Sequence, residues 1–278
     1  MNLSSKPNRA GPRESEKEMK KLMFAATAAV CAAVTFGLES ANIVGYAKDQ
    51  LAGNANLRAA QFNMVSAEGM DIQTIMPSIP EGEEFYSGCV QIQLCTANME
   101  TEATYMYLTA EDSPDGEAGW YNEDWDTRIE KMFAQGEGFI AVSDYDTGFV
   151  TTAGEVISGT QIIPLAVNAN LCGNNRPAEL DIQDIVPGLV YDEETGVLSK
   201  SEDFYSGCVQ IQLCTANMET EATYMYLTAE DSPDGEEGWY NEDWDARIEK
   251  TFNAGEGFVA VSDYDESFIS LPAVPGIN

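Results

Sequence analysis

The clearest pattern in the chain is a strict alternation of apolar and polar residues over 89–95, CVQIQLC. Because successive side chains of a strand point to opposite faces, this alternation predicts a half-buried β-strand with its three aliphatic residues facing the core. Cys89 and Cys95 then fall on the other face with the glutamines. Residues 103–108 are rich in strand formers and follow a turn-like segment at 98–101, so they predict the hairpin partner.

Other segments also indicate strands and turns. Short apolar groups separated by Gly and Asn over 43–62 and 70–77 are typical of short strands. Ser113-Pro114-Asp115-Gly116 predicts a turn, because Pro presets φ and Gly accepts positive φ. The apolar residues from Trp125 to Phe133 have helical spacing, yet a strand or coil is the preferred interpretation. Gly136-Glu137-Gly138 then predicts a turn into a strand over 139–142.

Much of the chain occurs twice. Residues 85–117 recur letter for letter at 204–236, an offset of 119, and the match continues with scattered changes to Phe149 and Phe268. The segment DIQ-x-I-x-P recurs at an offset of 110, which predicts an inserted surface loop near residues 191–196. The copies agree even in loops, which indicates recent copying, so their identity does not mark functional residues.

These patterns together predict a mainly β protein with two tandem β-sandwich-like modules. At 278 residues the chain is long enough for two separate cores. We place the modules at residues 42–157 and 158–278, joined by a short connection through Gly154–Gly159. A polar extension and a signal peptide occupy residues 1–41.

The N-terminal region has the pattern of an export signal. Met19-Lys20-Lys21 precedes an apolar run at 22–36 that is short for a membrane span. Cleavage fits after Ala41 or after Gly37, and translation starts at Met1 or Met19. The mature protein is therefore expected to be secreted, periplasmic or on the cell surface, with no membrane span.

The net charge and the lack of histidine exclude several classes of function. Beyond residue 41 the chain carries 43 acidic and 8 basic residues, a net charge of −35. Such a surface repels nucleic acid and attracts cations or basic partners, although acidity also simply keeps an exported protein soluble. With no histidine, Ser-His-Asp and Cys-His triads and histidine-ligated metals are excluded. Paired carboxylates and oxygen-ligated cations such as Ca²⁺ stay open.

Five cysteines follow the export signal: Cys89, Cys95, Cys172, Cys208 and Cys214. Export favours disulfides. Along a strand, however, Cys89 and Cys95 lie about 20 Å apart, too far for a bond between them. The odd total and this separation favour mostly free, buried thiols.

Two groups of residues could bind ligands. Carboxylates on turn-rich backbone are a candidate Ca²⁺ site without the EF-hand spacing, and a solvated acidic loop is the simpler interpretation; they are Asp112, Asp115, Glu117, Asp231, Asp234 and Glu236. Aromatic residues could form platforms for sugars, or they could fill the core; they are Trp120, Tyr121, Trp125, Trp239, Tyr240 and Trp244.

No reaction centre stands out in the sequence. In an exported chain with 43 acidic residues, two carboxylates that could act as a glycosidase pair are found by chance and do not indicate that activity. A glycoside hydrolase is therefore only a remote alternative. The Gly136-x-Gly138 pair lacks the third glycine of a dinucleotide-binding loop. We therefore expect no enzyme activity.

Several short motifs follow one another in each repeat: Asn-Leu at 56–57 and 170–171, DIQ-x-I-x-P, Gly-Trp, Gly-x-Gly-Phe and, in the first module, Gly154-Glu155-Val156. In these motifs the exported chain resembles a group of secreted bacterial β-repeat proteins of the form N-L…D-I…G-W…G-x-G-F…G-x-V. The resemblance implies a cell-envelope or extracellular location and no known catalytic residues. The second module ends at 271–274 without the Gly-Glu-Val, which predicts an incomplete final strand.

The expected function is a non-catalytic exported structural or adhesion protein of the cell envelope or extracellular space. The alternative is a glycan-binding protein in which two modules add avidity, with or without help from Ca²⁺. Its partners would be cell-envelope components or glycans.

Overall fold

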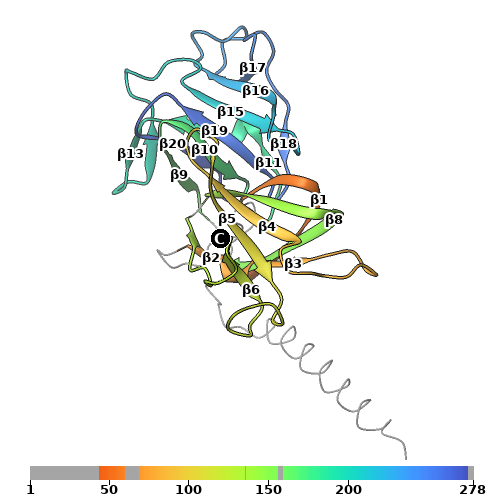
Figure 1. Ribbon diagram of the computed structural model, residues 1–278. Coiled ribbons are helices and arrows are strands. Elements are labelled where there is room, and N and C mark those ends of the chain that lie inside the picture. The colour runs from red at the N-terminus through yellow and green to blue at the C-terminus, as the bar shows by residue number, and fades with distance from the viewer. Residues whose placement is uncertain (1–43, 60–68, 135, 156–158, 275–278) are drawn as a thin grey trace, which may run out of the picture. The chain divides into compact units, whose positions relative to one another are not determined.

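The computed structural model describes residues 44–59, 69–134, 136–155 and 159–274, and these ranges are mainly β (Figure 1). They contain several antiparallel sheets, two short 3₁₀ turns and no α-helix. The predicted export signal and both candidate cleavage sites lie outside them. Nowhere in the described part of the chain is there a helix of the length and apolarity that crossing a membrane requires.

The described residues between 44 and 155, here the first half, form one six-stranded sheet and one two-stranded sheet. The larger sheet has the order β1-β8-β4-β5-β6, with β3 also paired to β8, and β2 pairs with β7. The strands are β1 (Val44–Ala59), β2 (Met70–Asp71), β3 (Met76–Ser78), β4 (Val90–Cys95), β5 (Thr101–Leu108), β6 (Gly119–Asn122), β7 (Met132–Phe133) and β8 (Gly138–Glu155).

Residues 159–274, the second half, repeat this order with more breaks. A five-stranded sheet has the order β10-β19-β15-β16-β17, a three-stranded sheet β12-β20-β9, and two pairs are β11-β18 and β13-β14. The strands are β9 (Gln161–Leu165), β10 (Asn168–Gly173), β11 (Leu180–Asp181), β12 (Val186–Gly188), β13 (Val190–Asp192), β14 (Val197–Ser199), β15 (Val209–Cys214), β16 (Thr220–Leu227), β17 (Gly238–Asn241), β18 (Thr251–Phe252), β19 (Gly257–Ser262) and β20 (Ser267–Leu271).

The alternating segment forms the predicted strand. In β4, Val90 and Ile92 are buried while Gln91 and Gln93 are partly exposed, and β4 pairs with β5 as a hairpin. The placement of Cys89 on the polar face was wrong. Gly88 adopts φ 84° just before the strand, and Cys89 is fully buried beside Val90 in the core. All five cysteines in the described ranges are free thiols.

The opening of the first half is more continuous than the sequence indicates. Instead of several short strands, β1 runs for 16 residues and pairs with the 18-residue β8. The glycine that suggested a turn lies at a register shift between Ala52 and Asn54, which bends the pair without ending it. Gly154 and Glu155 belong to β8, so the predicted connection begins later than Gly154.

The DIQ segments contain a 3₁₀ turn that the sequence interpretation missed. In η2 (Ile72–Thr74), Asp71 caps the turn by accepting a hydrogen bond from the Gln73 backbone N–H at 2.9 Å. The side chain of Asp181 does the same for η3 (Ile182–Asp184). Asp in this position satisfies a backbone donor that the short turn leaves free. The repeated Asp-Ile-Gln therefore encodes a capped turn and not a plain strand.

The region from Trp125 to Phe133 is coil followed by the two-residue strand β7. This agrees with the prediction of strand or coil in place of a helix. The insertion near 191–196 is a surface hairpin, β13–β14, and not a plain loop. At the end of the chain, β20 pairs on both sides, with β12 and β9, but has only five residues.

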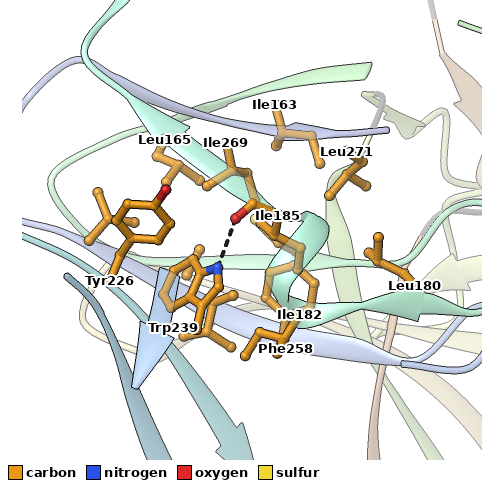
Figure 2. Close-up of a cluster of buried hydrophobic side chains, with 14 of the residues drawn as sticks. Ile163, Leu165, Leu180, Ile182, Ile185, Tyr226, Trp239, Phe258, Ile269 and Leu271 are labelled. Atoms are coloured by element: carbon orange, nitrogen blue, oxygen red, sulfur yellow. Dashed lines mark hydrogen bonds between the residues drawn. The ribbon is translucent and has the colours of Figure 1, made fainter. Parts of the chain in front are cut away.

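Each half has its own apolar core. In the second half, the five-stranded and three-stranded sheets both contribute to one cluster around Trp239 (Figure 2). β9 and β20 supply Ile163, Leu165, Ile269 and Leu271 from one side. The first half packs an equivalent cluster around Trp120, with Leu51 from the middle of β1 and Val150 from the C-terminal part of β8. Burial of these side chains is the main force that stabilises each half.

Candidate functional site

Two of the predicted platform tryptophans are core residues. Trp120 lies in β6, is fully buried, and donates its indole N–H to the carbonyl oxygen of Ile75 at 2.8 Å. Trp239 donates in the same way to Ile185 at 2.7 Å (Figure 2). Their rings also contact Tyr107 and Tyr226 edge to face, at centroid distances of 5.3 and 5.2 Å. Neither indole can stack on a sugar in this arrangement.

A glutamine holds each of these tryptophans in place. The Gln73 side chain donates to the carbonyl oxygens of Trp120 at 3.0 Å and Ile129 at 2.8 Å, and accepts from the Trp120 backbone N–H at 3.0 Å. Gln183 makes the same three bonds around Trp239. We call these residues the Gln–Trp clamp. At Gly119, before Trp120, an added Cβ would come within 2.5 Å of the Gln73 amide oxygen, so the clamp requires glycine there.

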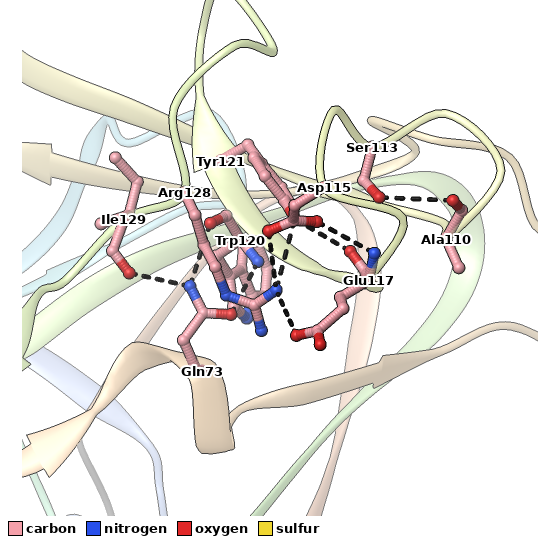
Figure 3. Close-up of polar contacts among 9 residues, drawn as sticks. All are labelled: Gln73, Ala110, Ser113, Asp115, Glu117, Trp120, Tyr121, Arg128 and Ile129. Atoms are coloured by element: carbon pink, nitrogen blue, oxygen red, sulfur yellow. Dashed lines mark hydrogen bonds and ion pairs between the residues drawn. The ribbon is translucent and has the colours of Figure 1, made fainter.

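The acidic turn after β5 is tied to the same region. The Tyr121 hydroxyl donates to the Asp115 carboxylate and to the carbonyl oxygen of Glu117, while Arg128 lies 3.4 Å from Asp115 and 3.3 Å from Glu117 (Figure 3). Asp112 accepts hydrogen bonds from Ser87 at 2.6 Å and Thr109 at 3.1 Å. These carboxylates therefore already have protein partners.

The second half repeats the turn. Tyr240 donates to Asp234 and to the carbonyl oxygen of Glu236, and Asp231 accepts from Ser206 at 2.6 Å. Tyr121 and Tyr240 are fully buried at their rings, so they join the turn to the core and do not form an open platform. Nowhere in the ranges that the structure describes do three acidic or cysteine side chains gather closely enough to hold a metal ion. The arrangement gives no support to Ca²⁺ binding.

The electrostatics of the turn follow from these contacts. The hydrogen bond from Tyr121 and the backbone N–H of Glu117 lower the pKa of Asp115, because both favour its ionised form. Tyr240 and the backbone N–H of Glu236 lower the pKa of Asp234 in the same way. Burial, together with the neighbouring Asp115, raises the pKa of Tyr121. A lowered carboxyl pKa and a raised phenol pKa describe a stabilising pair, not a proton-transfer site near neutral pH.

The remaining two predicted tryptophans lie at the surface. Trp125 is 40% exposed and Trp244 is 39% exposed, both in the turns after β6 and β17. Each adopts φ 63°, a left-handed conformation that is uncommon for a bulky residue. Asn122 fixes the first turn, since its side-chain oxygen accepts from the N–H groups of Asp126 and Thr127. The strained conformation holds the indole at the surface, which is where a ligand could contact it.

A tyrosine that the sequence analysis did not single out lies in the loop that the Trp125 ring covers. Tyr86 is 48% exposed, and the Trp125 ring packs over Gly88, two residues further on. The Tyr86 hydroxyl donates to Asp144 at 2.7 Å, which raises the pKa of Tyr86 to about 12. Tyr205 and Asp263 repeat this pair in the second half. Because Tyr86 lies in coil next to Phe85, which packs against the core, no alternation in the sequence indicated that Tyr86 would be exposed.

The exposed aromatic residues Tyr86 and Trp125, with Tyr205 and Trp244, are therefore the candidate site in this structure. Comparison with protein-family models, with curated proteins and with solved structures gives no match for this chain. The resemblance to secreted bacterial β-repeat proteins stays a prediction.

Proposed function

We propose that this chain is a non-catalytic, exported structural or adhesion protein built from two tandem β-sandwich-like modules, residues 42–157 and 158–278. The observation that supports it best is the role of the repeated motifs. In each half, Asp-Ile-Gln and Gly-Trp form the Gln–Trp clamp. The acidic turn binds the tyrosine that follows the clamp tryptophan, Tyr121 or Tyr240. The repeated motifs therefore stabilise the fold of each half.

The location rests on the export pattern at residues 19–41 and on the acidic surface. We expect the mature chain in the medium, periplasm or cell envelope, beginning at Asn42 or at Leu38. Fractionation of the native host, followed by N-terminal sequencing of the protein, tests this. Recovery of the chain in the cytoplasm with its first 37 residues intact would contradict an exported role.

Adhesion has its own test, because export alone would suit many functions. Beads coated with the purified chain should bind host cells or isolated envelope fragments, and binding should weaken as salt rises if the acidic surface carries it. Beads coated with an unrelated protein of similar charge are the control. Equal retention of the two coatings would remove adhesion and leave the structural role.

Glycan binding is the second candidate, favoured by the surface position of Trp125 and Trp244. A glycan array with and without EDTA should show weak binding that both exposed tryptophans support. Trp125→Ala combined with Trp244→Ala should abolish it, whereas Met132→Ala, another exposed apolar residue, should not. Substitution of Trp120 or Trp239 would be uninformative, since those rings stabilise the core. An array without binding would remove this candidate.

A further inference from the structure

A third apolar cluster packs residues of the first half against residues of the second half. Its centre is Ile140 of β8 and Val259 of β19, which are 3% and 1% exposed. Neither residue belongs to the core of its own half. The partly buried residues around them are Cys95, Met99, Val142, Ala169, Leu171, Cys214, Met218 and Val261. We call this set the central cluster.

The central cluster is built from equivalent positions of the two repeats. At the repeat offset of 119, Ile140 corresponds to Val259, and the other equivalent pairs are Cys95 with Cys214, Met99 with Met218, and Val142 with Val261. Both members of every pair lie in the cluster. An interface that joins the same surface patch of two subunits is two-fold symmetric, whereas head-to-tail packing joins different patches.

Two equivalent cavities support the same symmetry. One, of about 650 Å³, is lined by Cys95, Glu102 and Lys131 of the first half together with Asn170 of the second. The other, of about 480 Å³, is lined by the equivalent second-half residues, Cys214, Glu221 and Lys250, together with Asn56 of the first. Each half thus presents the same surface to the opening strand of the other half.

The backbone and the charges also suit this contact. The Ala169 N–H of β10 donates to the carbonyl oxygen of Ala97 at 3.0 Å, across the two halves. In each cavity a lysine neutralises a glutamate: Lys131 lies 2.6 Å from Glu137, and Lys250 lies 2.5 Å from Glu256. These pairs and the uncharged central cluster let two strongly acidic halves meet with little repulsion.

We infer that this face is a self-complementary association surface and that the partner it fits is another copy of the same repeat. The exported chain is then an internal dimer, in which one connection joins two subunits that associate through the same patch. Each repeat, once freed from the connection, should pair with itself as well as with its neighbour.

A cleavable version of the whole chain tests this. A protease site inserted between Gly159 and Thr160, both exposed, allows the folded protein to be cut after purification. Native mass spectrometry of the cut material should show the pair of different fragments and, after equilibration, pairs of identical fragments of both kinds. Only mixed pairs, or only single fragments, would overturn the inference.

Substitutions at the centre sharpen the test. Ile140→Asp with Val259→Asp should raise the dissociation constant of the cut fragments at least tenfold, while the uncut protein keeps its far-ultraviolet circular dichroism. Val197→Asp, on the exposed hairpin β13–β14, is the matched control and should leave association unchanged. If the double Asp variant fails to fold, Met99→Ala with Met218→Ala offers a milder loss of contact. Unchanged association of the folded variant would contradict the assigned surface.

Discussion

The two halves of the chain share one sequence at their centres and differ at their edges. Where the sequence is shared, the contacts repeat: the indole-to-carbonyl bond is 2.8 Å for Trp120 and 2.7 Å for Trp239. At the edges, the long strands β1 and β8 of the first half correspond to the separate strands β9 and β10, and β19 and β20, of the second. The centre thus specifies the fold, while the edges tolerate change.

Single residues account for part of this difference. In the second half, Ser262 and Ser267 share a hydrogen bond of 2.7 Å across the break between β19 and β20. The first half has Gly148 in place of Ser267, and a Cβ there would come within 2.8 Å of the Ser143 hydroxyl. Asn170 bridges the other break by accepting from the Ala166 N–H at 2.9 Å. Side chains therefore replace ladder bonds where the strands part.

Loss of either buried tryptophan should have the largest effect. Trp120→Ala and Trp239→Ala each remove a buried ring and its hydrogen bond, so each should lower the free energy of unfolding by about 3–5 kcal/mol. Urea unfolding followed by circular dichroism measures both. Trp125→Ala is the matched control and should cost less than about 1 kcal/mol, because its ring is partly exposed. A large loss for only one of the buried pair would show that the halves are not energetically equivalent.

The clamp glutamines should come next. Gln73→Ala and Gln183→Ala each remove three hydrogen bonds, one from a backbone N–H and two to carbonyl oxygens, which should cost about 2–3 kcal/mol. The carbonyl oxygens of Trp120 and Trp239 still accept from the backbone N–H groups of Ile129 and Ile248 at 2.9 Å. Differential scanning calorimetry of the two variants should show similar decreases in melting temperature. Gln91→Ala, at a partly exposed position of β4, serves as the control. Equal effects of Gln73→Ala and Gln91→Ala would remove the clamp as a stabilising unit.

A smaller effect should distinguish the halves. Lys200 forms an ion pair with Glu237 and lies 4.7 Å from the Tyr226 ring centroid, whereas the first half has Glu81 and Ala118 at these two positions. Lys200→Met should therefore cost about 0.5–1 kcal/mol and Glu81→Met close to nothing. Chemical denaturation in low and high salt tests the difference, which should shrink with salt. A cost that is the same in both halves would contradict the assigned contact.

The smallest effect concerns pH. Because Tyr121 and Tyr240 lower the pKa values of Asp115 and Asp234, these carboxylates stabilise the fold above their unfolded-state pKa. That stabilisation is lost as the pH falls through the lowered folded-state pKa. Arg128 lies 3.4 Å from Asp115 but Arg247 lies 3.8 Å from Asp234, so the first half should show the larger shift. Carboxyl titration by nuclear magnetic resonance, with Tyr121→Phe as the control that raises the pKa of Asp115, measures both.

Local patterns in the sequence predicted the β4–β5 hairpin and the Ser113–Gly116 turn, since alternation and turn chemistry act over a few residues. They did not predict the clamp, because Gln73 and Trp120 are 47 residues apart and no local sequence pattern indicates a contact between them. They also could not separate Trp120 from Trp125. Both lie in one aromatic and acidic stretch of the sequence. Trp120 is buried because it lies in strand β6, whereas Trp125 is exposed because it lies in a left-handed turn.

Backbone chemical shifts test the central claim, that both repeats fold into the same β structure. Assigned shifts should coincide residue by residue between 85–117 and 204–236, with strand values over β4, β5, β15 and β16. Small differences should appear only next to the edges that differ. Strand shifts in one copy with random-coil shifts in the other, or helical shifts in either, would contradict the account.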